Sequence, residues 1–184
     1  TSFPSASREQ VDAIVAMHGN RFHILQGGPG TGKTSCLAAL LDLELQQNPS
    51  LNFKLAAPTG KAAARMKEAI LSARKDMPAS GPLQSQELES YTLHRLLGAR
   101  PRQEHFKHNA SKPIHCDLLV VDESGMIGLP LMSRLLDALP KHARLLLLGD
   151  SDQLSSVETG SVFSDLIQAL PAHVAHLSES FRFN

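Results

Sequence analysis

The chain has 184 residues but only two cysteines, Cys36 and Cys116, and it carries no surplus of charge of either sign. Two cysteines indicate neither a disulfide framework nor a standard zinc site. We expect Cys36 to be a small buried side chain. The 18 basic residues balance 18 acidic ones, so overall charge does not argue for or against a nucleic-acid partner. Any such contact has to come from local patches of charge.

Long apolar runs are also missing. No stretch approaches the roughly 20 residues that span a bilayer, and no secretory signal is visible. We therefore expect a cytoplasmic protein with no membrane partner. The length of 184 residues suits one domain. Because the chain starts Thr-Ser-Phe-Pro and ends Ser-Phe-Arg-Phe-Asn, we expect it to be a segment of a longer protein.

The most informative feature that is present is the run Gly-Gly-Pro-Gly-Thr-Gly-Lys-Thr at 27–34, which matches the phosphate-loop pattern at every fixed position. Its glycines let backbone N–H groups turn inward around a phosphate, and a following helix adds its positive end. Lys33 would reach the terminal phosphates, and the Thr34 hydroxyl would bind Mg²⁺. The contacts with ATP are expected from Gly27, Gly28, Pro29, Gly30, Thr31, Gly32, Lys33 and Thr34. The alternative is a chance glycine-rich turn.

Apolar runs and amphipathic stretches alternate along the chain, which is typical of an α/β fold with a parallel sheet covered by helices on both faces. The predicted strands are 22–25, 53–57, 118–121, 144–148 and 173–177. The predicted helices are 7–18, 35–47, 59–75, 92–97, 131–139 and 161–170. The polar segments 78–90 and 99–115 are expected to be mobile loops. These elements form one predicted domain over 1–184.

Two carboxylates, Asp122 and Glu123, directly follow the most apolar predicted strand, 118–121. Ligands of open parallel sheets bind at the carboxyl ends of the strands. Asp122 is suited to hold Mg²⁺, and Glu123 to orient and activate a water against the terminal phosphate, which hydrolysis requires. The alternative for both is a helix cap.

A third polar group, Gly-Asp-Ser-Asp-Gln at 149–153, follows the leucine-rich strand. Gln153 could sense the terminal phosphate or the attacking water. Gly-Asp at a strand end is often only a turn. We expect the loop, Asp122 and Asp150 to converge at one edge of the sheet.

These motifs together resemble the first motor domain of a superfamily 1 DNA helicase. The likeness is closest to the RecD type, the alpha subunit of exodeoxyribonuclease V and its RecD-like relatives. The segments that carry it follow the family's order over nearly the whole chain. They are Gln10, 27–34, 56–65, 92–98, 120–124, 149–160 and 177–183.

The resemblance implies a RecA-like P-loop NTPase domain that hydrolyses ATP with Mg²⁺ and moves 5′-to-3′ on single-stranded DNA. It also implies a subunit of a helicase–nuclease complex for double-strand break repair and recombination, with nuclease chemistry on a partner chain. A second motor domain would be absent, so this domain would hold half of the ATP site and would not unwind DNA alone. Two alternatives stay open: a stand-alone RecD-like helicase, and a non-enzymatic, nucleotide-dependent scaffold.

Several residue roles follow only from the resemblance. Gln10 resembles the glutamine that reads the adenine edge, although its spacing from Ser7 also fits a capping box. Arg182 resembles the arginine that reaches the γ phosphate, as an arginine finger does. The alternative for Arg182 is an ordinary surface arginine. Lys33, Glu123, Gln153 and Arg182 would thus be the catalytic residues.

The resemblance also implies two groups of DNA contacts. Pro58, Thr59 and Gly60 resemble a motif that holds single-stranded DNA through its phosphates without reading its sequence. Thr92 and His94 belong to the next such motif. The alternatives are a Pro-Thr helix start for the first group and a purely structural histidine for the second.

Overall fold

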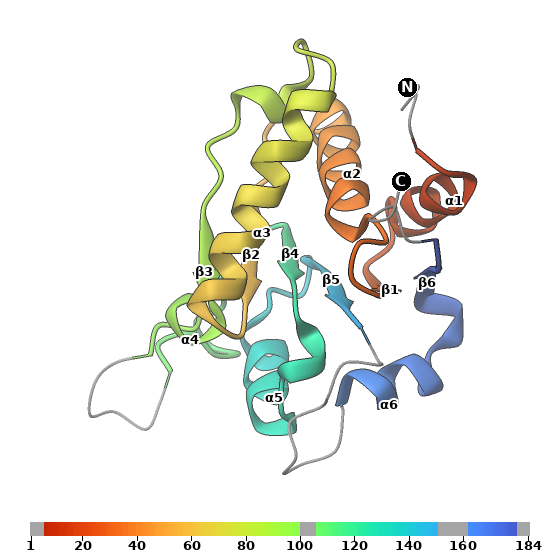
Figure 1. Cartoon of the computed structure of the whole chain (residues 1–184). Coiled ribbons are helices and arrows are strands. Elements are labelled where there is room, and N and C mark those ends of the chain that lie inside the picture. Colours follow the sequence, from red (N-terminus) through yellow and green to blue (C-terminus); the bar gives the residue numbers. More distant parts are fainter. Residues whose placement is uncertain (1–5, 100–105, 151–161, 180–184) are drawn as a thin grey trace.

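The computed structural model describes residues 6–99, 106–150 and 162–179. Its six strands form one sheet in the order β3-β2-β4-β5-β1-β6, and every neighbouring pair is parallel (Figure 1). The predicted parallel α/β sheet is therefore confirmed. The strands are β1 Phe22–Gly27, β2 Phe53–Ala57, β3 Ser90–Thr92, β4 Leu118–Val121, β5 Arg144–Gly149 and β6 Val174–Leu177.

Helices cover both faces of this sheet, as predicted. The α-helices are α1 Arg8–Met17, α2 Lys33–Gln47, α3 Gly60–Ala73, α4 Leu93–Leu96, α5 Leu129–Ala138 and α6 Val162–Ala169. Short 3-10 helices are η1 Arg74–Asp76, η2 Pro82–Ser85, η3 Ser124–Met126 and η4 Pro171–His173. Among the described helices, none has the length and apolar character needed to cross a membrane.

The core has two halves because side chains alternate across each strand. Leu25 of β1 packs on the side of α1, α2 and α3, whereas Ile24 next to it packs on the side of α4, α5 and α6. The same alternation places Leu146 in the first half and Leu147 in the second. Strands buried on both faces appear in the sequence as continuous apolar runs, which explains why β4 and β5 were predictable.

One strand escaped prediction. The segment 92–97 is predicted to be helical, but Ser90–Thr92 forms β3 beside β2, and the helix α4 begins only at Leu93. All three residues of β3 are half-buried, because β3 is the outermost strand on one side of the sheet. Because this strand is short and mostly polar, it has no apolar run from which the sequence alone could predict it.

The segment 78–90 has more structure than a plain loop. It contains η2, and Leu83 and Leu88 are buried in the core. The buried Asp42 of α2 accepts a hydrogen bond from the Leu83 N–H at 3.0 Å. The predicted loop thus contains a short 3-10 helix and two buried leucines, and its mobility stays a prediction. Of the other predicted loop, 99–115, residues 100–105 lie outside the described part.

His23 of β1 is a buried titratable group with no evident function. It is 4% exposed, and neither ring nitrogen has a hydrogen-bond partner within the described residues. Burial lowers the pKa of His23, and the nearby His173 lowers it further. An unpaired buried polar group costs stability.

We therefore expect His23→Leu to stabilise the domain, by about 1 kcal/mol at pH 7. The gain should grow toward pH 5. With a folded pKa below the unfolded value of about 6.5, the unfolded state takes up a proton first and the wild type loses stability as pH falls. Denaturant unfolding of both proteins at pH 7 and pH 5 measures this. A clear loss of stability at both pH values would show that the imidazole contributes favourable contacts.

Candidate functional site

The predicted phosphate loop joins the end of β1 to the start of α2. Gly30 and Gly32 have φ of +81° and +85°, in the left-handed region that favours glycine. The Thr31 hydroxyl donates to the Gly28 carbonyl at 2.9 Å, which closes the turn. The Lys33 ammonium also donates to the Gly28 carbonyl, at 3.0 Å. The loop is therefore a hydrogen-bonded turn at the positive end of a 15-residue helix.

Gly27 is required for a different reason, which is close packing. A Cβ there would lie 2.6 Å from Thr31 Oγ1 and 2.9 Å from the Leu177 carbonyl oxygen of β6. At Gly28, by contrast, a Cβ would meet nothing within 4 Å. The two glycines therefore form a matched pair for substitution.

We expect Gly27→Ala to lower the free energy of unfolding by about 1–3 kcal/mol, because the overpacked loop or β6 has to shift. Gly28→Ala should change it by less than about 0.5 kcal/mol. Chemical denaturation of the two variants gives the comparison. Equal stabilities would mean that the loop absorbs the methyl group without strain.

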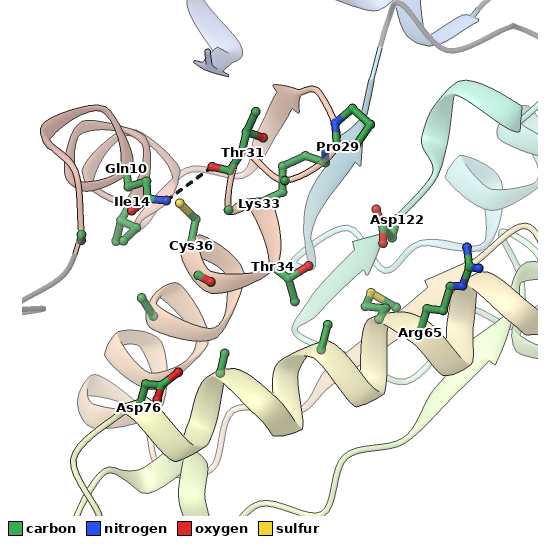
Figure 2. A pocket seen from close by; sticks show the side chains of 18 of the residues that line it. Gln10, Ile14, Pro29, Thr31, Lys33, Thr34, Cys36, Arg65, Asp76 and Asp122 are labelled. Carbon is green, nitrogen blue, oxygen red and sulfur yellow. Dashed lines mark hydrogen bonds between the residues drawn. The ribbon is translucent and has the colours of Figure 1, made fainter. Parts of the chain in front are cut away.

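Gln10 of α1 makes the predicted capping box and also contacts the loop. Its backbone N–H donates to the Ser7 hydroxyl at 3.3 Å, and its side-chain oxygen accepts from the Ser7 N–H at 3.1 Å. The amide nitrogen donates to the Thr31 carbonyl at 3.4 Å, as Figure 2 shows. The contact with the loop was not foreseen, and the role in binding adenine stays a prediction.

The two carboxylates lie at the carboxyl end of β4. The Asp122 carboxylate accepts a hydrogen bond from the Glu123 N–H at 2.8 Å. Burial raises the pKa of Asp122, while this hydrogen bond and the charge of Lys33 act in the opposite direction. Glu123 has φ +53°, an uncommon backbone conformation for a residue other than glycine. Such strain clusters at functional sites. Its side chain makes no capping hydrogen bond to η3, so the alternative role as a cap is not seen for Glu123.

Loop and carboxylates face one cleft of about 770 Å³, shown in Figure 2. Its lining comes from the phosphate loop, α1, α2, α3 and the ends of β4 and β5. Lys33, Thr34, Asp122, Glu123 and Asp150 all line it. The predicted convergence of the loop, Asp122 and Asp150 at one edge is confirmed, because parallel strands end side by side there.

The two predicted DNA motifs also lie together, at the ends of β2 and β3. A Cβ on Gly60 would be 3.9 Å from Thr92 Cγ2. Both threonines cap helices: the Thr59 hydroxyl accepts from Ala62 N–H and the Thr92 hydroxyl from Arg95 N–H, each at 3.2 Å. Thr59, Gly60 and His94 are exposed, and Pro58 is half-buried. Capping and DNA contact are compatible, and the latter stays a prediction.

A protein-family model described as an AAA domain matches residues 10–159, most of the chain. The chain belongs to this AAA domain family. The matched region starts at Gln10 and contains the phosphate loop, both predicted DNA motifs and the two carboxylates.

Curated relatives of this AAA domain confirm the RecD-type resemblance. The RecBCD enzyme subunit RecD of Mycolicibacterium smegmatis is 42% identical over 98% of the chain and 34% of its own length. RecD of Haemophilus influenzae is 43% identical over 89% of the chain and 27% of its own length. The ATP-dependent RecD2 DNA helicase of Deinococcus radiodurans is 42% identical over 90% of the chain and 20% of its own length. The AAA domain thus spans about a third or less of these relatives.

Among solved structures, Pif1 helicase from Candida albicans superposes on the AAA domain with a TM-score of 0.63. The match covers 96% of this chain and 40% of the other, at 20% sequence identity. At this identity the likeness shows the fold alone, and it agrees with the predicted RecA-like architecture.

A further link in the AAA domain was missed from sequence. Glu9 of α1 accepts hydrogen bonds from the Ser178 N–H at 2.9 Å and the Ser178 hydroxyl at 2.8 Å. The hydroxyl contact is the main reason that the pKa of Glu9 is lowered. Glu9 therefore fixes the chain where it leaves β6, next to the phosphate loop. The predicted catalytic residues Gln153 and Arg182 lie outside the described residues.

Proposed function

We propose that this domain binds and hydrolyses ATP as the motor of a RecD-type DNA helicase. The observation that carries the proposal is the single cleft shared by the phosphate loop and by Asp122 and Glu123. A phosphate loop alone supports nucleotide binding. A second carboxylate at the end of β4 supports hydrolysis, because a water attacking the terminal phosphate has to be oriented and deprotonated.

Four side chains of the cleft have roles that fit their chemistry. The loop N–H groups and Lys33 bind the β and γ phosphates, and Glu123 orients the water and takes up its proton. Thr34 and Asp122 would hold Mg²⁺, since a hydroxyl and a carboxylate are oxygen ligands of the kind that Mg²⁺ prefers. Burial raises the pKa of Asp122, and a bound cation would favour its charged form. Mg²⁺ would neutralise charge on the phosphates.

We also propose that single-stranded DNA crosses the ends of β2 and β3. The adjacent Gly60 and Thr92 and the exposed Thr59 and His94 support this path. Hydroxyl and backbone groups at helix starts suit phosphates and carry no sequence preference. The helix α3 begins at this edge and passes the nucleotide cleft, where Arg65 and Met66 line the wall. It thus offers a direct mechanical connection between DNA and ATP.

For the intact protein we propose 5′-to-3′ movement as a subunit of a helicase–nuclease complex that acts in double-strand break repair and recombination. RecD subunits of the RecBCD enzyme at 42–43% identity support this assembly. The RecD2 helicase is as similar, at 42%, and supports a stand-alone helicase as second candidate. Co-purification of the full-length protein with nuclease and helicase subunits from its own cells would separate the two.

The experiment that tests the proposed motor uses the full-length protein. ATP hydrolysis is measured with and without single-stranded DNA, and unwinding is measured on duplexes that carry a 5′ or a 3′ tail. We expect DNA to stimulate hydrolysis and only the 5′-tailed duplex to be unwound. Absence of hydrolysis, with or without DNA, would refute the motor. Unwinding from the 3′ tail would refute the polarity alone.

A further inference from the structure

The charge balance of the cleft leaves one basic residue without an assigned role. Of the described residues that line the cleft, two are basic, Lys33 and Arg65, and four are acidic, Asp76, Asp122, Glu123 and Asp150. A nucleoside triphosphate brings further negative charge into this acidic site. Each cation that faces the cleft therefore matters for its binding.

Arg65 is placed to supply such a charge. It lies on α3, the helix opposite the phosphate loop, and Figure 2 shows its side chain on the side of the cleft that holds Asp122. The residue is exposed, and the described part of the chain contains no carboxylate in an ion pair with it. Its helix is held in place by the Thr59 cap at one end and by the buried Met66 and Ile70 along its length.

We propose that Arg65 binds the terminal phosphate of the nucleotide from the α3 side of the cleft. This inference rests on the proposed ATP site. Lys33 is held on the loop side, where its ammonium donates to the Gly27 and Gly28 carbonyls at 2.5 and 3.0 Å. The two cations thus lie on different walls, and a guanidinium suits a phosphate because it can donate two parallel hydrogen bonds.

Because α3 starts next to the proposed DNA contacts, the distance between Arg65 and the terminal phosphate would depend on the position of that helix. Thr59 caps α3, and Arg65 follows within two helical turns. A shift of α3 when DNA binds would move the guanidinium relative to the phosphate. The contact would therefore distinguish ATP from ADP and depend on the same helix that contacts DNA.

The test compares nucleotide affinities of the full-length protein and its Arg65→Ala variant by titration calorimetry. The ligands are ADP and a non-hydrolysable ATP analogue, each with Mg²⁺. We expect the analogue to bind about tenfold more weakly to the variant, the loss typical of a charge-assisted hydrogen bond, and ADP to change less than about twofold. Arg65→Lys should lose less, because it keeps the charge.

Lys67→Ala is the matched control, since it also removes a cation from α3. Lys67 is not among the residues that line the cleft, and its charge lowers the pKa of Glu89. The affinities of this variant for both nucleotides should equal those of the wild type. Equal weakening of ADP and the analogue in Arg65→Ala, or no weakening of either, would overturn the proposal. If the wild type bound neither nucleotide, the ATP site itself would be refuted, so the two failures are distinguishable.

Discussion

Replacing Glu123 with Gln should lower DNA-stimulated ATP hydrolysis by the full-length protein at least a hundredfold. General-base catalysis contributes about 10²–10⁴ in rate, and glutamine cannot accept the proton of the attacking water. The substitution keeps size and shape, so affinity for a non-hydrolysable ATP analogue should stay within about threefold. Steady-state hydrolysis and calorimetric binding, measured on the same preparations, separate the chemical step from binding.

Glu68→Gln is the control for this experiment, because Glu68 is an exposed glutamate on α3 outside the cleft lining. It should hydrolyse ATP at the wild-type rate. Undiminished hydrolysis by Glu123→Gln would remove the proposed base. The hypothesis of a nucleotide-dependent scaffold would be favoured if both variants and the wild type bound nucleotide without hydrolysing it.

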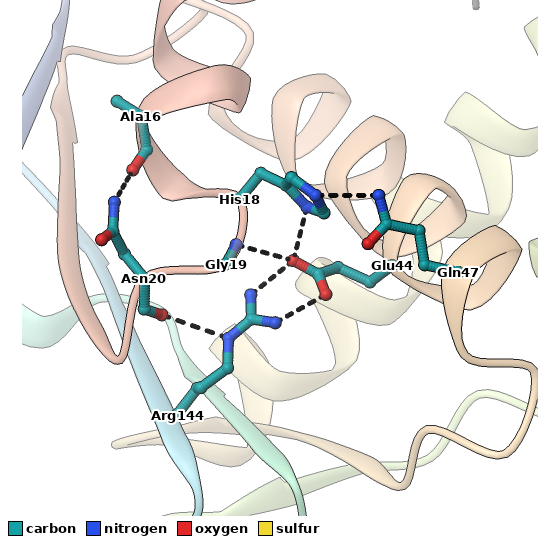
Figure 3. Close-up of polar contacts among 7 residues, drawn as sticks. All are labelled: Ala16, His18, Gly19, Asn20, Glu44, Gln47 and Arg144. Atoms are coloured by element: carbon teal, nitrogen blue, oxygen red, sulfur yellow. Dashed lines mark hydrogen bonds and ion pairs between the residues drawn. The ribbon is translucent and has the colours of Figure 1, made fainter.

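The second large effect is on the stability of the fold. It arises at the amino-terminal end of β5, away from the cleft at the carboxyl ends of the strands. Figure 3 shows Glu44 of α2 paired with Arg144, the first residue of β5. The two terminal guanidinium nitrogens of Arg144 donate to the carboxylate, Nη1 at 2.6 Å, and the third nitrogen, Nε, donates to the Asn20 carbonyl at 3.1 Å. His18 and the Gly19 N–H contact the same carboxylate. The Glu44 side chain is 7% exposed, so it depends on these partners.

Arg144→Met should therefore lower the free energy of unfolding by about 3–5 kcal/mol, because a buried carboxylate loses its main partner. For a chain of this length, each kcal/mol lowers Tm by roughly 2–4 °C. The double variant Glu44→Leu, Arg144→Met should recover most of the loss, since no charge is left buried. Arg134→Met, at an exposed arginine of α5, serves as control. Denaturant unfolding of the four proteins measures these differences.

The effect of Arg144→Met should also depend on pH. Burial raises the pKa of Glu44, but the hydrogen bonds and charge of Arg144 outweigh it, so the pKa is lowered overall. The pair therefore stabilises the fold fully above the pKa of an unfolded glutamate, about 4.3. This stabilisation is lost as the pH falls through the lower pKa of Glu44 in the folded protein. The difference in free energy of unfolding between wild type and Arg144→Met should become smaller from pH 6 toward pH 3. A difference independent of pH would mean that the arginine stabilises through its packing alone.

The predictions from sequence agree most closely with the structure for motifs whose residues lie close together in the chain. The phosphate loop, the Ser7–Gln10 capping box and the carboxylates after β4 each lie within eight residues, so spacing alone indicated their geometry. The strand β3 was missed because three half-buried residues carry no periodic signal. For Gln153 and Arg182, which lie outside the described residues, the sequence predictions stand untested.

The sequence by itself predicted five of the six strands and the six α-helices in their order along the chain, the phosphate loop, and the position of Asp122 and Glu123 at a strand end. These depend on local conformation and on the alternation of apolar residues. The convergence of the phosphate loop, Asp122 and Asp150 followed from the shared direction of parallel strands, but only the tertiary structure decided which other distant residues meet. Gln10 contacts a loop 21 residues away, Glu44 pairs across 100 residues, and Glu9 holds a segment 169 residues away. Such contacts form because packing against a shared sheet brings the elements together, and no local pattern encodes them. The placement of Arg65 in the cleft has the same origin.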